Sequence, residues 1–266
     1  MFKVPKGVRM QVKRRQIPSF VILPGRKIVD FSVITEPKLE IAGKIMEILS
    51  SFGSSVITGT IDLAKDGMLI EGFLDITGMK VPLEELFDVL RTEEGVREAY
   101  HGMICENFKV FSAPSVPFAG SHRLVIFRLE HIAGFMNMLK KRWGSAGASV
   151  LYALGHNAGI DSIRQFRRII RAPNRELIEF LLMLGRSFGW YTDYELVKLG
   201  EKGGIGRFYD LFECKIVEGK LNKPNSQWMR GFFVGIFDEL YRVRVSVEET
   251  RCIAKGDPYC EFVAER

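Results

Sequence analysis

Residues 249–262 read Glu-Thr-Arg-Cys-Ile-Ala-Lys-Gly-Asp-Pro-Tyr-Cys-Glu-Phe. The Gly256-Asp257-Pro258 triplet predicts a chain reversal that can bring Cys260 back beside Cys252. Glu249 stands three positions before Cys252, so in a regular strand the two side chains point to opposite faces, and a shared metal needs a bulge or bend between them. Three interpretations of the two cysteines are open at this point: zinc ligands, reduced structural thiols, or a redox-active pair.

Two predicted helices upstream each carry a pair of glycines four positions apart. Gly155 and Gly159 lie in one of them, and Gly231 and Gly235 lie in the other. Residues four apart share a helical face, so each pair lets another backbone or a ligand approach closely. A ligand pocket and a tight helix contact make the same demand, and the spacing does not separate them.

The C-terminal half resembles V4R (4-vinyl-reductase-type) small-molecule-binding domains over residues 120–264, through the tail motif, the glycine-bearing helices and the dipeptide Gly189-Trp190. The resemblance implies an α+β domain of helices packed on an antiparallel sheet. It also implies an enclosed, largely apolar pocket for a small hydrophobic or aromatic ligand. The candidate ligand-binding residues, which an ordinary core would use equally well, are Trp190, Trp228, Phe232 and Phe233.

The same resemblance points to a metal site. In phenol-sensing transcription activators that carry this domain, a structural zinc is held by a Cys on the glycine helix, a Glu and two tail Cys residues. The resemblance places Glu249, Cys252 and Cys260 at three of these positions and Ser226 at the fourth. Serine is a poor zinc ligand at neutral pH, because zinc sites use thiolate, imidazole or carboxylate groups. Cys214, predicted on a neighbouring strand, is the candidate for the missing thiolate.

The N-terminal half follows the order β-α-β-β-α-β, which is the ferredoxin-like arrangement. Hydrophobic periodicity predicts strands at residues 28–34, 56–63, 68–76 and 103–111, with helices at 39–52 and from 82 onward. The element order resembles ACT-type regulatory domains, which dimerise and bind amino acids between subunits. The first strand-to-helix loop, Thr35-Glu36-Pro37-Lys38, lacks the Asp and Gly usual in that family, so a plain dimerisation module is the alternative to amino-acid binding.

These segments divide the chain into a basic arm at 1–26, an ACT-like domain at 27–112, a proline-containing linker at 113–118 and a V4R-like domain at 119–266. Residues 1–29 hold eight Lys and Arg and no Asp or Glu, so with a whole-chain charge of +6 the remainder sums to 6 − 8 = −2. The basic character is therefore local. The arm either contacts an anionic partner or is simply solvated.

The V4R-like part also contains an arginine-rich helical segment. Arg164, Arg167, Arg168 and Arg171 follow the spacing i, i+3, i+4, i+7, which predicts four guanidinium groups on one side of a helix. An anion on a ligand, a partner subunit or nucleic acid would relieve their repulsion, and a solvated face is the plain alternative. The pattern predicts strands at 123–127, 190–198, 207–217, 243–254 and 259–263, and helices at 130–143, 147–170, 174–188 and 226–241.

Several functional classes lack support in the sequence. The four histidines are scattered without catalytic or metal-ligand spacing. The longest apolar runs are too short to cross a bilayer, and the N-terminus shows no export signal. We therefore expect a cytoplasmic protein with no membrane partner, whose four cysteines are thiols or metal ligands rather than a disulfide framework.

Together these features favour an intracellular, ligand-sensing regulatory protein that is not an enzyme. We expect a homodimer formed through the ACT-like domain, a small hydrophobic ligand in the V4R-like domain, and an effector that is another protein or a nucleic acid reached by the basic arm. One alternative is an adaptor or assembly subunit, the role of the same fold in vesicle-tethering complexes. A reductase-type enzyme is the weaker alternative, because no nicotinamide fingerprint or acid–base pair supports it.

Overall fold

The computed structural model describes residues 17, 19–64, 66–112, 117–119 and 122–266. The chain forms two compact units, residues 1–124 and residues 125–266, and each is described by itself. Most of the expected basic arm and of the expected linker lies outside the described residues. Among the helices that are described, none has the length and apolar character needed to cross a membrane.

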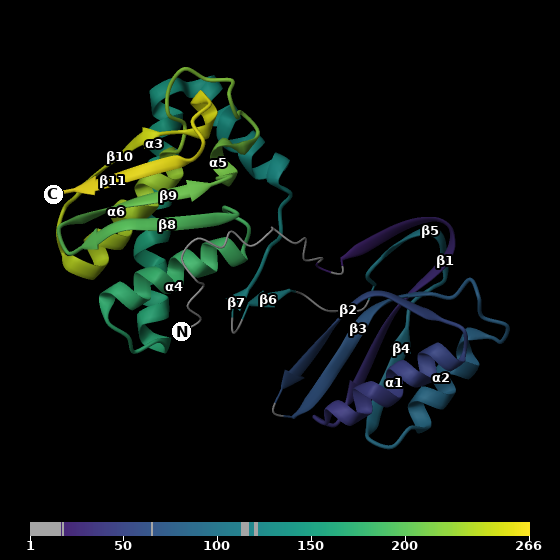
Figure 1. The fold of residues 1–266 in the computed structure, drawn as a ribbon. Coiled ribbons are helices and arrows are strands. Elements are labelled where there is room, and N and C mark those ends of the chain that lie inside the picture. The colour runs from purple at the N-terminus through teal and green to yellow at the C-terminus, as the bar shows by residue number, and fades with distance from the viewer. Residues whose placement is uncertain (1–16, 18, 65, 113–116, 120–121) are drawn as a thin grey trace. The chain divides into compact units, whose positions relative to one another are not determined.

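The first unit is a four-stranded antiparallel sheet with two helices on one face and an added fifth strand (Figure 1). Its sheet order is β2-β3-β1-β4, which is the ferredoxin-like order and confirms the predicted fold class. Asp66 and Gly67 make the tight β2–β3 connection, as their sequence predicts. The elements are β1 Phe20–Thr35, α1 Leu39–Ser51, β2 Ser55–Ala64, β3 Gly67–Asp75, α2 Leu83–Thr92, β4 Val96–His101 and β5 Cys105–Val110.

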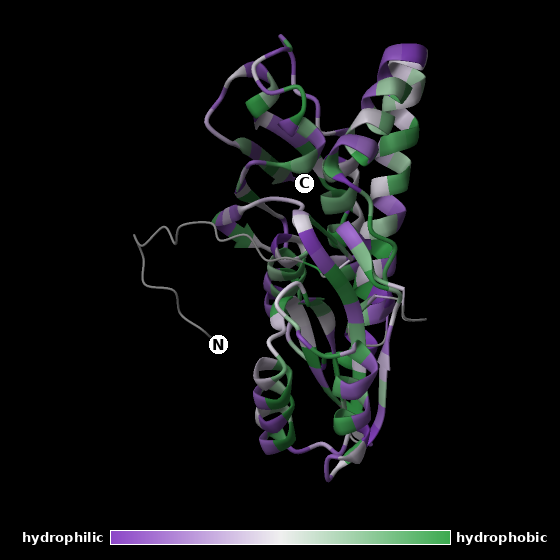
Figure 2. Cartoon of the chain, turned by 90° about the vertical axis from the view of Figure 1, so that its right-hand side faces the viewer, coloured by the Kyte–Doolittle hydropathy of each residue, from purple (hydrophilic) through white to green (hydrophobic). Residues whose placement is uncertain are grey.

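Both helices of this unit bury one apolar stripe against the sheet. In α1 the stripe contains Ile41, Ile45 and Leu49, whose spacing of four residues repeats on one helical face. These side chains and those of α2 pack on alternate residues of β1, such as Phe31 and Val33. Hydrophobic and hydrophilic residues thus share each helix (Figure 2), and the opposite helix face is left to solvent.

Two sequence predictions for this unit are wrong in their details. The strand that completes the fold is β4, which pairs with the C-terminal part of β1, and not the later segment at 103–111. That later segment is β5, an extra strand that pairs with residues 20–28 of β1. Residues 20–26, assigned above to the basic arm, are therefore the first part of a long strand.

The second unit packs helices on a four-stranded antiparallel sheet of order β10-β11-β9-β8 (Figure 1), as the predicted α+β class requires. Gly144, with φ 55° and ψ −125°, breaks α3 into two helical parts, matching the two helices predicted from the sequence. The elements are α3 Leu129–Ile169, α4 Asn174–Ser187, β8 Asp193–Gly200, β9 Gly203–Tyr209, α5 Phe212–Lys215, α6 Gln227–Tyr241, β10 Ser246–Arg251, a 3-10 turn Ile253–Lys255 and β11 Cys260–Glu265.

Two predicted strands differ from the structure. The strand expected at 123–127 is reduced to β7, His122–Arg123, which pairs with β6, Phe118–Ala119. The strand expected at 207–217 ends at Tyr209, because Asp210 adopts a left-handed conformation (φ 59°) that turns the chain into the short helix α5. Cys214 therefore lies on a helix and not on a strand.

The paired glycines settle into a helix crossing. A Cβ added to Gly155 would lie 2.0 Å from the carbonyl oxygen of Trp228, and one added to Gly235 would lie 2.1 Å from that of His156. The glycines of α3 thus face the backbone of α6, and those of α6 face the backbone of α3. Of the two interpretations that the spacing allows, tight helix packing is the one observed.

Candidate functional site

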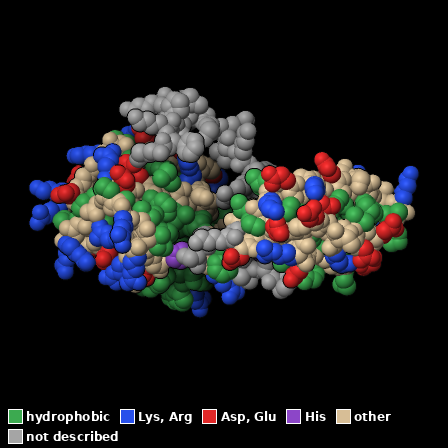
Figure 3. Space-filling view, turned by 90° about the horizontal axis from the view of Figure 1, so that it is seen from below, with side chains coloured by type: hydrophobic (Ala, Val, Ile, Leu, Met, Phe, Trp, Pro, Cys, Tyr) green, Lys and Arg blue, Asp and Glu red, His purple; other side chains and the backbone are tan. Residues whose placement is uncertain are grey.

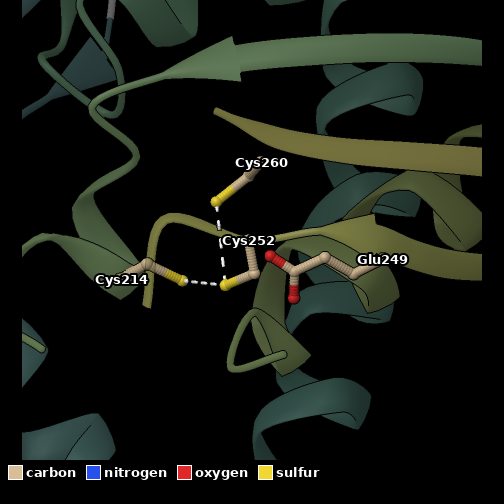
Figure 4. Close-up of side chains that lie close together, drawn as sticks. All are labelled: Cys214, Glu249, Cys252 and Cys260. Atoms are coloured by element: carbon tan, nitrogen blue, oxygen red, sulfur yellow. Dashed lines mark hydrogen bonds between the residues drawn. The ribbon is translucent and has the colours of Figure 1, made fainter. Parts of the chain in front are cut away.

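Three cysteines and one glutamate meet at one end of the second unit's sheet (Figure 4). Cys214 comes from α5, Glu249 from β10, Cys252 from the residue before the 3-10 turn, and Cys260 from the start of β11. The Sγ atom of Cys252 lies 3.5 Å from that of Cys214 and 4.0 Å from that of Cys260. All four side chains are buried, and their potential ligand atoms lie within 4.8 Å of one another.

A β-bulge makes this convergence possible. The register between β10 and β11 shifts between Glu249, which opposes Phe262, and Arg251, which opposes Glu261. The extra residue turns the chain so that Glu249 and Cys252 approach the same point, although they stand three positions apart. The chain then reverses, and the Asp257 carboxylate accepts a hydrogen bond of 2.8 Å from the backbone N–H of Cys252.

The donor set fits a tetrahedral zinc ion. Zinc–thiolate bonds of about 2.3 Å in tetrahedral geometry place two sulfur atoms roughly 3.8 Å apart, and the two observed separations are 3.5 and 4.0 Å. The same distances are far longer than the roughly 2.05 Å of a disulfide bond, and all three cysteines are free. The cluster could therefore hold a metal such as zinc through three sulfur atoms and one carboxylate oxygen.

Ser226 supports the carboxylate of this cluster. Its hydroxyl donates to one oxygen of Glu249 at 2.7 Å, and its backbone N–H donates to the other at 2.9 Å. The same hydroxyl lies 3.0 Å from the sulfur of Cys214. Ser226 thus stands where the resemblance puts a fourth ligand, while Cys214 reaches the cluster from a different element and supplies the third sulfur.

The ionisation of the cluster reflects its burial. Burial, together with the nearby Cys252, raises the pKa of Glu249 to about 8. The thiols of Cys214 and Cys260 hydrogen-bond to the sulfur of Cys252 and hold the pKa of that residue well below its usual range. One sulfur of the cluster is thus set up as a thiolate, the form of cysteine that binds metal ions.

A second buried network anchors Cys214, and the sequence analysis did not identify it. The carboxylate of Glu213, which is fully buried, accepts hydrogen bonds of 3.1 Å from the backbone N–H groups of Trp228 and Met229 at the start of α6. Lys140 lies 3.7 Å from the same carboxylate and donates to the Asn225 carbonyl at 2.9 Å. A carboxylate at a helix N-terminus satisfies otherwise unpaired N–H groups, so Glu213 joins α5 to α6 beside the cluster.

Three of the four candidate ligand-binding aromatics pack on one another. The rings of Trp228 and Phe232 stack with centroids 5.3 Å apart, and Trp190 meets each of them edge-on at 5.2 Å. None of these three lines the apolar pocket that the structure shows in this unit. The enclosed pocket expected beside Trp228 and Phe232 is therefore replaced by solid aromatic packing.

The apolar pocket lies between the sheet and two helices, and Phe233 is the one candidate aromatic that lines it. Its floor is formed by β8, β9, β10 and β11, and its roof by side chains of α4 and α6. The lining is almost wholly carbon, and the pocket is partly open to solvent. Its free volume is about 40 Å³, so a ring-sized ligand would have to displace side chains.

The four arginines do not form one helical face. The helix α3 ends at Ile169, so Arg171 lies beyond it. Arg164 forms an ion pair of 3.1 Å with Glu239 of α6, and Arg167 hydrogen-bonds to the side chain of Asn174. At least two of the four thus have partners within the unit. Figure 3 shows many Lys and Arg side chains around hydrophobic ones on one face of this unit.

The comparisons with known proteins agree with this geometry. The α+β unit has the architecture of a small-molecule sensory domain, and residues 208–266 match the V4R domain family, so the chain ends in a V4R domain. The match includes Cys214, Glu249, Cys252 and Cys260. No curated protein matches the chain significantly by sequence.

Several solved structures are similar to parts of the chain. The phenol-responsive sensory domain of the transcription activator PoxR, determined with phenol, has a TM-score of 0.50 at 15% identity, covering 58% of this chain and 91% of that chain. A vinyl-4-reductase family protein from Methanocaldococcus jannaschii has 0.36 at 16% identity, covering 53% and 83%. The ACT domain of GTP pyrophosphokinase from Chlorobium tepidum has 0.25 at 18% identity, covering 29% and 97%. At such identities the likeness concerns the fold.

Proposed function

We propose that this protein is a non-enzymatic, ligand-sensing regulator whose V4R unit binds a small hydrophobic or aromatic molecule. The observation that carries the proposal is the apolar pocket between the sheet and helices α4 and α6, in a unit with the fold of a phenol-responsive sensory domain. Pockets lined mainly by apolar side chains are typical small-molecule sites.

The metal cluster has a structural role in this proposal. Cys214, Glu249, Cys252 and Cys260 would hold a zinc ion that ties α5, β10 and β11 together. Zinc supplies cross-linking here and no chemistry, because all four positions of a tetrahedral site are filled by protein. Closely spaced thiols stay reduced or metal-bound in a reducing compartment, so we place the protein in the cytoplasm.

We propose that the first unit dimerises and so passes the state of the V4R unit to an effector. Its outer strand β2 is an edge strand that carries Val56, Ile61 and Leu63, all of them exposed. Exposed apolar edge strands favour symmetric pairing. We expect the effector to be a partner protein or a nucleic acid contacted by the basic N-terminal residues. Light scattering should give twice the monomer mass, and a strictly monomeric protein at micromolar concentration would contradict this part.

Ligand binding is tested by thermal unfolding of the full chain with a panel of small aromatic and aliphatic molecules. A ligand that binds only the folded state raises the unfolding temperature by mass action. Ala264, on the pocket floor, is replaced by Leu to fill the space, and Val263→Leu on the other face of the same strand is the matched control. We expect shifts in the wild type and in the control, and none in Ala264→Leu. If no compound stabilises the wild type, the sensor proposal fails.

A further inference from the structure

The pocket exists because two side chains are missing from the centre of the sheet. Residues on β9 that face the helices alternate, and this inner row contains Gly204, Gly206 and Phe208. Gly206 lies between Leu196 of β8 and Phe262 of β11 in the pairing register. Where neighbouring strands place large side chains, β9 places none at two successive inner positions, so the space above them is left free.

Aromatic rings enclose one end of this space. Phe208, Phe233 and Phe262 all line the pocket, and their ring centroids lie 5.1 to 5.7 Å apart in each pairing. Such separations, with tilted or edge-on planes, are those of favourable aromatic contacts. A further aromatic ring placed over the glycines could meet these three in the same way.

Polar groups close to the pocket are already engaged. The hydroxyl of Tyr191 donates to the carbonyl oxygen of Leu182 at 2.6 Å. Glu249, next to Phe262 across the β10–β11 pair, accepts from Ser226. Because the lining is almost wholly carbon, a hydroxyl or charged group buried there would lose its hydrogen bonds to water without gaining others, which weakens binding.

We propose that this pocket selects an uncharged aromatic hydrocarbon and discriminates against ligands that bury a hydroxyl or an ionised group. The inference rests on the proposed function, which it narrows to one chemical class. The free volume of about 40 Å³ is smaller than the cavity of about 150 Å³ known to admit benzene. The ligand therefore enlarges the pocket as it enters, through movement of side chains of α4 and α6 that form its roof.

Toluene and phenol are the matched probes, because they differ chiefly in a methyl group against a hydroxyl. Calorimetric titration of the full-length protein should give at least about tenfold tighter binding of toluene, which corresponds to about 1.4 kcal/mol. Val247, a pocket residue on β10, is then replaced by Thr to place a hydroxyl of similar size in the lining. We expect Val247→Thr to bind phenol more tightly and to narrow the difference between the two probes.

The control is Val263→Thr, on the opposite face of the sheet, which should leave both affinities unchanged. Ile236→Thr, from the roof of the pocket, is the second variant if Val247→Thr does not fold. Equal or tighter binding of phenol by the wild type, or no response to the introduced hydroxyl, would overturn this inference while leaving the sensor proposal standing. Binding of neither probe, together with a panel that produces no shift, would overturn both.

Discussion

The sulfur atoms of Cys214 and Cys252 lie 3.5 Å apart, although the two residues are 38 positions apart in the chain. The helix α5 carries one and the turn after β10 carries the other, so the contact joins two segments that no backbone pairing connects directly. Cys260 and Glu249 complete a buried cluster around them. A metal ion at this point would fix the end of the sheet on which the apolar pocket also lies.

Replacing a cysteine of the cluster should cost metal and stability together. We expect Cys252→Ser or Cys260→Ser to lose zinc and to lower the free energy of unfolding by on the order of 4 kcal/mol, because metal binding is coupled to folding. Elemental analysis and thermal unfolding measure the two effects. Cys105→Ser, in the first unit, is the matched control and should change neither. Wild-type protein that contains no metal and is insensitive to chelator would contradict the zinc assignment.

Ser226→Cys should keep the fold and tighten metal binding. The new thiol would stand beside both Cys214 and Glu249, which the present hydroxyl contacts at 3.0 and 2.7 Å. In protein loaded with cobalt, the sulfur-to-metal absorption should rise relative to wild type, because one more thiolate is close enough to bind. Unchanged absorption and affinity would show that this position lies outside the metal's reach.

Closing the gap between α3 and α6 should be strongly destabilising. Gly235→Ala places a Cβ 2.1 Å from the carbonyl oxygen of His156, so the two helices must separate. We expect a loss of about 2–3 kcal/mol, as for an overpacked core. Gly134→Ala, in the same α3 helix but with no atom within 4 Å of its added Cβ, should instead gain up to about 1 kcal/mol. Urea unfolding of the two variants measures the contrast, and equal stabilities would count against the packing interpretation.

A buried ion pair should make the first unit sensitive to acid. Burial alone would raise the pKa of Asp30, but hydrogen bonds from Ser112 and Lys109 outweigh it and hold that pKa below its usual range. The stabilisation is therefore present above the unfolded-state pKa of about 3.9 and is lost as pH falls through the lower folded-state pKa. Calorimetry of the full chain in acid should show this loss.

The matching variant is Asp30→Asn. It leaves the Lys109 ammonium, which is only 5% exposed, without its buried counter-ion. Removing one partner of such a pair costs about 3–5 kcal/mol, and the acid-dependent part of the stability should disappear with it. A variant as stable as the wild type at neutral pH would show that Asp30 and Lys109 do not depend on each other.

Local sequence signals predicted the elements that carry their own periodicity. The stripe of α1, the Asp66-Gly67 connection and the need for a bulge after Glu249 were all readable, because each depends on neighbours within a few positions. The place of Cys214 was not, since it required knowing that Asp210 would end β9 and start a helix. Asp tolerates the left-handed region better than most residues, and this was the one signal available there.

Tertiary partners were beyond the reach of a single sequence. The i, i+4 glycines announced a close approach, but whether a helix or a ligand filled it depended on where the second pair would lie. Trp228 and Phe232 were assigned to a pocket, yet they stack on each other and on Trp190. The pocket instead arises from Gly204 and Gly206, whose missing side chains become informative only once the sheet pairing is known.

Amide hydrogen exchange of the full-length protein, with and without saturating toluene, tests the central claim most directly. If the V4R unit receives its ligand between the sheet and the helices, exchange should slow in β9, β11 and α6 and stay unchanged in α1 and α2 of the first unit. Unaltered exchange throughout residues 203–265 at saturating ligand, or protection confined to other segments, would contradict the account.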